Sequence, residues 1–255
     1  MRVLVWNMNK RRSAWDYVRR NAENFDVALL QETHDPFSTL EDQWRSVIWR
    51  PYSREPGSLL ARWGSAVIAP RFELASYDPG EGFPWLRELD GCVAVARWTK
   101  DPTWFASVHT QASPVPREVL ALHPWDEIPL CTPGRKVWQM DLIPFELHKL
   151  FAGHTFVWGG DLNSAERMDD LPGFSGGNRR LREIWAEAGS RDLRTRFHTE
   201  EQQTFYAPSR GAYQLDHVFG DAATESRVVD WRVDTQPVLS QPTLSDHAPI
   251  WVELQ

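Results

Sequence analysis

Cysteine is scarce in this 255-residue chain, which has only Cys92 and Cys131. Two cysteines are too few for a disulfide framework, and their separation matches no spacing of a zinc site. The sequence also lacks any uncharged run of about 18 residues, which excludes an ordinary membrane-spanning helix. Its first apolar stretch turns polar at Asn7, too early for a signal peptide. We therefore expect a cytoplasmic protein with unreactive thiols.

Positive charge is also in deficit. The formal net charge is -7 at pH 7, and only four lysines stand beside 24 arginines. A chain of this charge does not bind long nucleic acids by bulk electrostatics, because phosphate neutralisation needs clustered basic residues. Arginine suits bidentate phosphate contacts, so the basic tracts at 10–12, 19–20 and 179–182 are either a local phosphate-binding patch or a solvated surface.

No internal repeat, low-complexity tract or linker interrupts the chain. Its polar clusters are evenly spread, which favours one domain over residues 1–255. A hydrophobic fraction of 42%, with 12% aromatic residues, is enough to bury a sizeable core. We expect most of the 14 tryptophans to be packing residues.

The first residues predict a strand, a helix and a second strand. Val3 to Trp6 has the apolar run of a buried strand, Ser13 can cap a helix, and Asp26 to Leu30 is a second buried run. A right-handed crossover between parallel strands brings both strand ends to one edge of a sheet. Asn7 and Glu32, which follow the two runs, should therefore be neighbours.

The rest of the chain continues this alternation. A turn-like sequence at 99–102 predicts an antiparallel hairpin, so the sheet should be mixed. Helices are expected over 135–151, disturbed by Pro144, and over 179–188. Other short runs rich in Val, Phe, Trp and Ala predict strands. These lie at 65–69, 92–98, 104–108, 155–158, 204–206, 214–219, 228–233 and 249–254.

Acid, amide and imidazole groups stand where several of these apolar runs stop, which is typical of a fold that gathers one polar site along one edge. Glu32 ends a buried strand, where a carboxylate is costly unless a metal or a hydrogen-bond partner neutralises it. Taken alone, such a glutamate is more often a surface cap than a metal ligand. With Asn7 beside it and Asp161 and Asp246 placed in the same way, oxygen ligands accumulate. This set suits Mg²⁺ or Mn²⁺ better than zinc.

His247 is the strongest candidate for acid–base chemistry. Adjacent residues on a strand point to opposite faces, so Asp246 and His247 should not share one target. Asp216, on the preceding strand, is the better partner to orient the imidazole. His109, at the end of another apolar run, is a second candidate for an acid or a phosphate contact, while His217 should face away and pack locally.

A glycine-rich turn follows the predicted strand at 155–158. Gly159 and Gly160 let the chain turn sharply and place Asp161 and Asn163 on the loop. By itself this is ordinary turn chemistry. In company with the other clusters it predicts a catalytic loop.

Taken in order, these motifs resemble those of the endonuclease/exonuclease/phosphatase superfamily, the deoxyribonuclease I-like fold. The resemblance spans residues 3–254 and implies an α/β (α+β) protein, a four-layered sandwich of two packed mixed β-sheets flanked by helices. It also implies hydrolysis of phosphoester bonds with a divalent metal. The motifs are Trp6-Asn7-Met8-Asn9, Leu30-Gln31-Glu32-Thr33, His109, Gly160-Asp161-Leu162-Asn163, Leu215-Asp216 and Ser245-Asp246-His247-Ala248-Pro249-Ile250.

For the metal, the resemblance implies that Asn7, Asn9 and Glu32 lie at a bound Mg²⁺ or Mn²⁺ and that Asp246 supports this region. The same motifs bear on substrate choice. A histidine at position 109 matches the deoxyribonuclease I and sphingomyelinase branches. The exonuclease III and apurinic-endonuclease branch usually has a tyrosine there, which argues against a role in abasic-site repair.

For catalysis, the resemblance implies that Asp161 and Asn163 position the attacking water or its oxygen. His247, held by Asp216, would act as a general base or as a phosphate-polarising group. A phosphodiester is anionic and repels a nucleophile, so a cation must neutralise its oxygens while a base takes a proton from water.

The leading hypothesis is a metal-dependent nuclease that cleaves DNA or RNA. The alternative is a phosphoesterase of the same fold, sphingomyelinase- or inositol-phosphatase-like, that acts on a phosphorylated small molecule or lipid head group. Long loops at 76–91 and 111–134 would favour the alternative if their aromatic residues, Trp85 and Trp125, were exposed. A binding module without turnover is a third reading, although every expected catalytic residue type is present. No obligate protein partner is evident.

Overall fold

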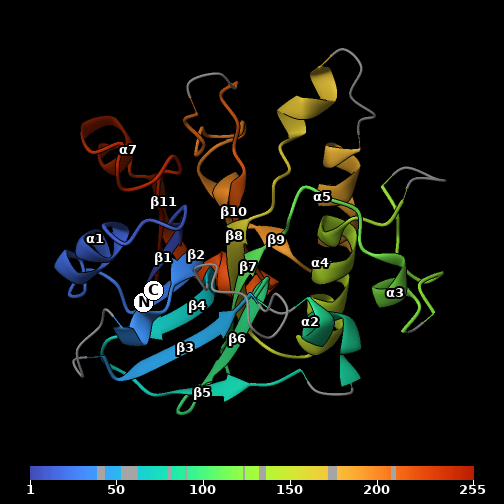
Figure 1. The fold of residues 1–255 in the computed structure, drawn as a ribbon, viewed down its shortest axis with the longest axis horizontal. Coiled ribbons are helices and arrows are strands. Elements are labelled where there is room, and N and C mark those ends of the chain that lie inside the picture. The colour runs from blue at the N-terminus through green and yellow to red at the C-terminus, as the bar shows by residue number, and fades with distance from the viewer. Residues whose placement is uncertain are drawn as a thin grey trace.

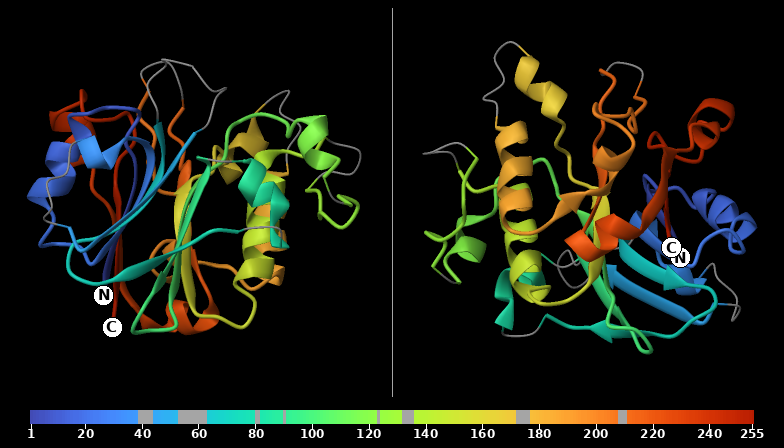
Figure 2. Two further views of the ribbon diagram at one scale, coloured as in Figure 1. Left: turned by 60° about the horizontal axis from the view of Figure 1, so that its bottom comes forward. Right: turned by 180° about the vertical axis from the view of Figure 1, so that it is seen from behind.

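The computed structural model describes residues 1–38, 44–52, 63–79, 82–89, 91–122, 124–131, 136–171, 177–207 and 211–255. Within them, two six-stranded sheets pack face to face, and helices cover both outer faces (Figures 1 and 2). Each sheet contains parallel and antiparallel strand pairs. This arrangement confirms the predicted four-layered α/β sandwich. No helix in the described part of the chain is long and apolar enough to cross a membrane.

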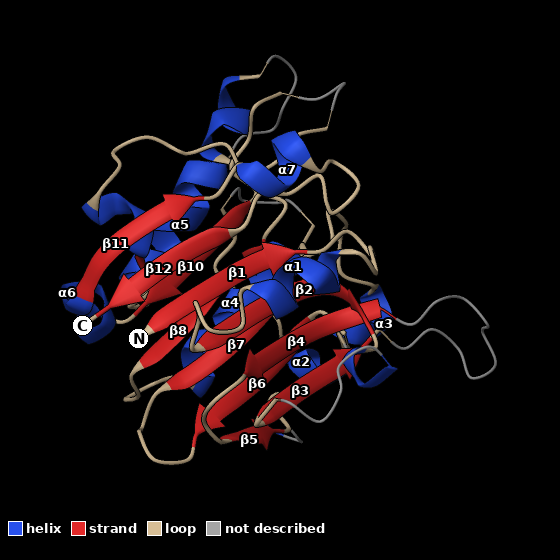
Figure 3. Cartoon of the chain, turned by 90° about the vertical axis from the view of Figure 1, so that its left-hand side faces the viewer, coloured by secondary structure: helices blue, strands red, loops and turns tan. Residues whose placement is uncertain are grey.

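The first sheet contains the two strands predicted at the start of the chain. Its members are β1 (Arg2–Asn7), β2 (Val27–His34), β3 (Ser46–Pro51), β4 (Trp63–Ala69), β11 (Val228–Val233) and β12 (Ile250–Leu254). Their order is β11-β12-β1-β2-β4-β3. β1 and β2 run parallel with Asn7 opposite Gln31, so both strands end at the same edge. Arg2 pairs with Glu253, and the two termini lie side by side (Figure 3).

The second sheet has the same construction around a different parallel pair. Its members are β5 (Leu74–Tyr77), β6 (Val93–Trp98), β7 (Trp104–His109), β8 (Phe156–Asp161), β9 (Arg191–Asp192) and β10 (Asp216–Gly220), in the order β5-β6-β7-β8-β10-β9. β6 and β7 form the predicted hairpin. β7 and β8 run parallel with His109 opposite Asp161, and Asp216 of the antiparallel β10 lies opposite Asp161. Three polar residues therefore meet at one edge.

Helices form the two outer layers. α1 lies in front of the first sheet in Figure 3, and α4 and α5 pack on the second sheet. The short 3-10 helices are Pro36–Ser38, Glu166–Asp170 and Leu193–Arg196. The α-helices are α1 (Ala14–Arg20), α2 (Pro84–Glu88), α3 (Arg117–Leu120), α4 (Gln139–Leu150), α5 (Asn178–Glu187), α6 (Ala222–Arg227) and α7 (Gln236–Ser240).

The alternation of side chains along β1 explains the layers. Val3 and Val5 face the core between the two sheets, whereas Leu4 and Trp6 face the layer that holds Trp15 of α1. Successive strand residues point to opposite faces, so a strand covered on both sides must be apolar throughout. This burial on both faces explains the continuous apolar run from Val3 to Trp6.

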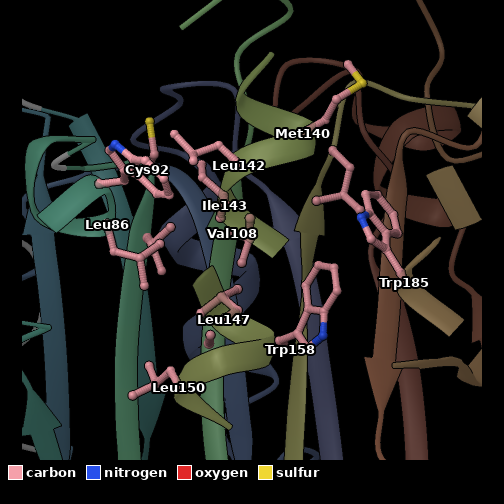
Figure 4. Packing of buried hydrophobic residues seen from close by; sticks show 14 of the residues in the cluster. Leu86, Cys92, Val108, Met140, Leu142, Ile143, Leu147, Leu150, Trp158 and Trp185 are labelled. Atoms are coloured by element: carbon pink, nitrogen blue, oxygen red, sulfur yellow. The ribbon is translucent and has the colours of Figure 1, made fainter. Parts of the chain in front are cut away.

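A third core fills the space between the second sheet and its helices (Figure 4). Val108 and Trp158 of the sheet meet Ile143 and Leu147 of α4, and the rings of Trp158 and Trp185 are 5.7 Å apart in an edge-on arrangement. Each such side chain stabilises the fold by roughly 1.5–3 kcal/mol when fully buried. This packing fixes β7 and β8, whose ends carry polar residues, against a rigid support.

Several predicted elements differ from the structure. Ser13 makes no side-chain cap and instead donates to the Thr243 carbonyl at 3.2 Å. Helix α4 continues through Pro144 without a break, and the expected strand at 204–206 is only a bridge at Phe205. The predicted loops at 76–91 and 111–134 contain α2 and α3. Residue 135, the expected start of a helix, lies outside the described residues.

Glu146 of α4 is buried, and its Oε2 has no hydrogen-bond partner in the described structure. Burial raises the pKa of Glu146 from 4.5 to about 7, although Lys149 partly opposes the shift. The folded protein therefore keeps a proton that the unfolded chain has released, so this group lowers stability as pH rises through that interval. Glu146→Gln removes the titration.

Wild type should lose stability relative to Glu146→Gln as pH rises. The difference in free energy of unfolding, variant minus wild type, should increase by roughly 1–3 kcal/mol between about pH 5 and about pH 8. Urea unfolding of both proteins at the two pH values measures this change. A difference between the two proteins that is the same at both pH values contradicts the assignment.

Candidate active site

Polar side chains from both sheets meet at one edge of the sandwich. Asn7 Nδ2 donates to Asp161 Oδ2 at 2.9 Å and so joins the end of β1 to the end of β8. His109 Nε2 lies 3.4 Å from Glu32 Oε1 and 3.9 Å from Asp161 Oδ2. His247 Nε2 lies 3.8 Å from the same Asp161 oxygen. Residues from five separate parts of the sequence therefore form one cluster.

Glu32 reaches this cluster through an irregularity in β2. The pairing of β2 with β4 shifts register between Leu30 and Thr33, and Glu32 has a φ of 49°. This left-handed region is sparsely occupied by residues other than glycine. A bulge re-aims a side chain that would otherwise follow the alternation, and strained backbone of this kind collects at functional sites. Asn9, Lys10 and Asn163 also have positive φ.

His247 and Asp216 form a buried pair. His247 Nδ1 lies 2.7 Å from Asp216 Oδ2, and the ring of Phe205 packs 4.9 Å from the imidazole. Burial alone would lower the pKa of His247, but the carboxylates of Asp216 and then Asp161 raise it to about 10. The imidazole is therefore cationic at neutral pH.

Asp161 is the carboxylate that the other groups share. It accepts hydrogen bonds from Asn7 and from the backbone of Asn163, and the Asn163 side chain also donates to the Thr110 carbonyl at 2.8 Å. Burial raises the pKa of Asp161 to about 7, against the opposing effect of His247. Asp161 is thus the group in the cluster that changes its charge near neutral pH.

His109 differs from His247 in charge. It is buried, and its Nδ1 has no hydrogen-bond partner among the described residues. Burial lowers the pKa of His109 to about 4, although Glu32 partly opposes the shift. A neutral imidazole can donate one hydrogen bond but has no surplus proton. Of the two roles expected for His109, the structure favours a phosphate contact over a general acid.

Asp246 and His247 both face the cluster, so the prediction that they cannot share one target is wrong. Asp246 Oδ1 lies 3.9 Å from His247 Nε2 and accepts a hydrogen bond from Asn9 Nδ2 at 2.8 Å. The alternation rule fails because β12 begins only at Ile250. Before it the chain is a loop with a single bridge at His247.

His217 lies on the other side of β10 from the cluster. Its Nε2 is 2.8 Å from Arg182 Nη2 and 2.9 Å from the Ser164 carbonyl, and burial lowers its pKa well below the usual value. Arg182 on α5 also donates to the Ser164 carbonyl at 2.8 Å. This contact ties the loop after Asp161 to the strand that starts at Asp216.

Sequence reasoning missed Lys10 and Trp63. Lys10 Nζ lies 3.2 Å from Glu32 Oε2 and 4.6 Å from the centre of the Trp63 ring, and that ring stands edge-on to His109 at 5.5 Å. The signal for Lys10 was its position directly after Asn9. Its membership of a basic tract suggested a solvated surface instead.

The acidic side chains of the cluster fit a hard divalent cation. Asp161, Asp216 and His247 have ligand atoms within 4.8 Å of one another, but His247 Nδ1 and Asp216 Oδ2 already bind each other. Glu32, whose side chain is 14% exposed and pairs with the half-exposed Lys10, supplies a carboxylate that a cation can reach, and Asp246 lies nearby in the cluster. Asn7 and Asn9 direct their amide N–H groups at Asp161 and Asp246, so they support the acidic groups. Several carboxylates around one point suit Mg²⁺ or Mn²⁺.

Gly160 allows the two sheets to approach behind the cluster. Its φ is 145°, and a Cβ there would lie 2.0 Å from the Val108 carbonyl oxygen and 2.7 Å from Gln31 Cδ. Gly160→Ala should therefore lower the free energy of unfolding by about 3 kcal/mol or more. Gly153, with a φ of 78° and nothing within 4 Å, is the matched control, for which about 1 kcal/mol is expected. Equal losses in urea unfolding of the two variants would contradict the close approach.

The fold and the cluster define a class of phosphoester-hydrolysing enzymes. The chain belongs to the Endonuclease/Exonuclease/phosphatase family, whose sequence model matches residues 4–247. Membership confirms the resemblance seen in the sequence motifs. No curated protein sequence matches the chain significantly.

Solved structures share the whole fold. A 3′ phosphatase, NExo, from Neisseria bound to a product DNA hairpin has a TM-score of 0.71 and 17% identity, and the match covers 100% of this chain and 99% of that one. An AP endonuclease from Archaeoglobus fulgidus has a TM-score of 0.68 and 18% identity, with 100% and 99% covered. The AP endonuclease LMAP from Leishmania major has a TM-score of 0.69 and 18% identity, with 100% and 87% covered. At these identities the likeness shows the fold alone.

Proposed function

We propose that this protein is a divalent-metal-dependent phosphodiester hydrolase that cleaves nucleic acid. The observation that carries the proposal is the buried Asp216–His247 pair, joined through Asp161 to His109 and Glu32 by contacts of 3.4 to 3.9 Å. A cationic imidazole and several carboxylates around one point are what an anionic ester and an attacking water require together.

The charges of the cluster assign the roles. Glu32, with support from Asp246, would hold Mg²⁺ or Mn²⁺, which when bound would supply the Lewis acid that neutralises the non-bridging oxygens. His247, kept cationic by Asp216, contacts a phosphate oxygen as the polarising group. Asp161 accepts the proton of the attacking water, because its pKa of about 7 lies near the operating pH. Asn163 fixes the Asp161 loop.

A nucleic acid substrate is supported by the exposed basic residues that follow Lys10 and by the neighbours of known fold. Arg11 and Arg12 follow Lys10 directly, both are exposed, and their side chains make no ion pair within the described structure. Among the similar structures, the Neisseria NExo protein is bound to a DNA hairpin. Arginines at this position are suited to phosphates on either side of the cleaved bond.

A small phosphoester is the second candidate substrate, and specific ion pairs favour it. Arg179 pairs with Asp170, and Arg180 pairs with Glu183 and Glu187. Two arginines of the 179–182 tract are thus neutralised, which leaves little basic surface for a long polymer on a chain of charge -7. The two loop tryptophans differ in exposure. Trp85 is buried and anchors its segment, whereas Trp125 is 45% exposed.

A substrate panel tests the proposal. Plasmid DNA, single-stranded DNA, RNA, phosphoinositide and bis-nitrophenyl phosphate are each incubated with Mg²⁺, Mn²⁺ or EDTA. We expect cleavage of at least one nucleic acid with metal and none with EDTA. Turnover of the small esters alone would favour the second candidate, and absence of turnover on every substrate would overturn the proposed function.

An Arg11→Ser, Arg12→Ser double variant separates polymer from small-ester binding. We expect KM for the preferred nucleic acid to rise and to become less dependent on salt, because fewer counterions are released on binding. The kinetics with bis-nitrophenyl phosphate then serve as the comparison within the same protein. An unchanged KM for the polymer would remove these arginines from the proposed substrate path.

A further inference from the structure

Lys10 is the charged group of the cluster that the proposed function leaves without a role. Its backbone N–H donates to the Glu32 carbonyl at 3.0 Å, and its ammonium lies 3.2 Å from Glu32 Oε2. Main chain and side chain are thus both bound to Glu32. The residue holds this place at a φ of 56°, a backbone conformation that costs of order 1–3 kcal/mol in a residue with a side chain.

Aromatic rings direct the Lys10 side chain. The ammonium lies over the Trp63 ring, and Tyr52 stacks on that ring at 4.8 Å with an interplanar angle of 2°. The Lys10 side chain nevertheless keeps 46% of its surface exposed. An ion pair so exposed adds little to stability, so stability alone does not explain the strained backbone.

We propose that Lys10 sets the metal affinity of the site and binds the substrate phosphate. This inference rests on the proposed function, because it concerns the same Glu32. A lysine ammonium and a divalent cation that both contact one carboxylate repel each other, so Lys10 weakens metal binding. The flexible stem lets the ammonium leave Glu32 and meet an anionic phosphate oxygen beside His109. Metal therefore binds tightly only when substrate is present to take up the ammonium.

Metal affinity without substrate is the first test. Mn²⁺ binding to the full chain is measured by titration calorimetry for wild type, Lys10→Met, Glu32→Gln and Lys100→Met. Lys100 is an exposed lysine in the turn before β7, at the opposite end of that strand from His109, and gives the matched control. We expect Lys10→Met to bind Mn²⁺ about tenfold more tightly, Lys100→Met to equal wild type and Glu32→Gln to lose binding.

Substrate affinity is the second test. At saturating Mn²⁺, KM for bis-nitrophenyl phosphate should rise about tenfold in Lys10→Met. The KM of Lys10→Arg should lie between those of Lys10→Met and wild type. Tighter metal binding with weaker substrate binding is a pair of opposite changes that simple damage to the site does not produce.

The outcomes separate the two proposals. If Lys10→Met binds Mn²⁺ no more tightly than wild type, while Glu32→Gln does not bind it, only the role of Lys10 is overturned. A KM that is unchanged in Lys10→Met overturns the phosphate contact. Failure of both wild type and Lys10→Met to bind Mn²⁺, or full binding by Glu32→Gln, overturns the metal site of the proposed function itself.

Discussion

Replacing His247 with alanine is expected to lower kcat for a phosphodiester by about 10³-fold, and also to lower the free energy of unfolding, because the buried Asp216 carboxylate loses its partner. The imidazole supplies a fixed positive charge beside Asp161, and electrostatic groups of this kind contribute about 10²- to 10³-fold, with further loss when proton transfer is also disturbed. Single-turnover kinetics with saturating Mg²⁺ measure the change. A variant that keeps kcat within tenfold of wild type would contradict the assigned role.

Asp216→Asn is the companion variant, because it keeps the imidazole and removes the charge that holds its proton. In wild type we expect activity to rise as Asp161 loses its proton near pH 7 and to fall as His247 loses its own near pH 10. Without the Asp216 carboxylate, burial dominates and lowers the pKa of His247. The alkaline limb of the pH profile should therefore move to lower pH. An alkaline limb that stays in place would mean that Asp216 does not control the imidazole.

Glu32→Gln is expected to lower metal-dependent activity by about 10³-fold or more, because it removes the negative charge of the proposed metal ligand while keeping the shape of the side chain. The measurement is kcat as a function of Mg²⁺ concentration, with Glu23→Gln as control. Glu23 is exposed and lies in the turn after α1, so its variant should match wild type. Recovery of full activity by Glu32→Gln at high Mg²⁺ would make Glu32 a minor ligand.

The convergence of the cluster was predictable because it follows from strand direction. β1 and β2 are parallel, and so are β7 and β8, so Asn7, His109 and Asp161, which end their strands, must reach one edge of their sheets. Glu32 reaches the same edge from the irregularity inside β2. Apolar runs followed by Asn7, Glu32, His109 and Asp161 carried this information. The packing of the two sheets, which the family resemblance implied, then places both edges together.

The details that the sequence did not reveal depend on local backbone geometry. Lys10 contacts Glu32 with both its backbone N–H and its ammonium and has a positive φ, a local geometry that no periodicity encodes. Asp246 and His247 share a target because they lie in a loop where strand alternation does not apply. The edge strands β3 and β5 were not predicted, because they are short, contain polar residues and lack the continuous apolar run of central strands.

The charges of the two site histidines also required the structure. From the sequence, His109 and His247 are both strand-end or loop histidines near acids. In the fold, His109 is buried with its Nδ1 unpartnered, whereas His247 binds Asp216 directly, so their pKa values move in opposite directions. Burial and contact distance decide the shift, and neither is visible in spacing along the chain.

His109 also bears on substrate class. The family resemblance links a histidine at this position to the deoxyribonuclease I and sphingomyelinase branches, while AP endonucleases are among the structures of similar fold. Because those likenesses have identities of 18%, they leave the choice of substrate to the panel of nucleic acids and small esters.

The most direct test of the account is a crystal structure of the protein soaked with Mn²⁺, read by anomalous scattering. We expect one strong peak within about 2.2 Å of a Glu32 carboxylate oxygen, with Asp161 and His247 around it and the Asp216–His247 bond intact. A peak elsewhere on the molecule, or none at a Glu32 oxygen at saturating Mn²⁺, would contradict the claim that these distant segments build a metal-dependent phosphodiesterase site.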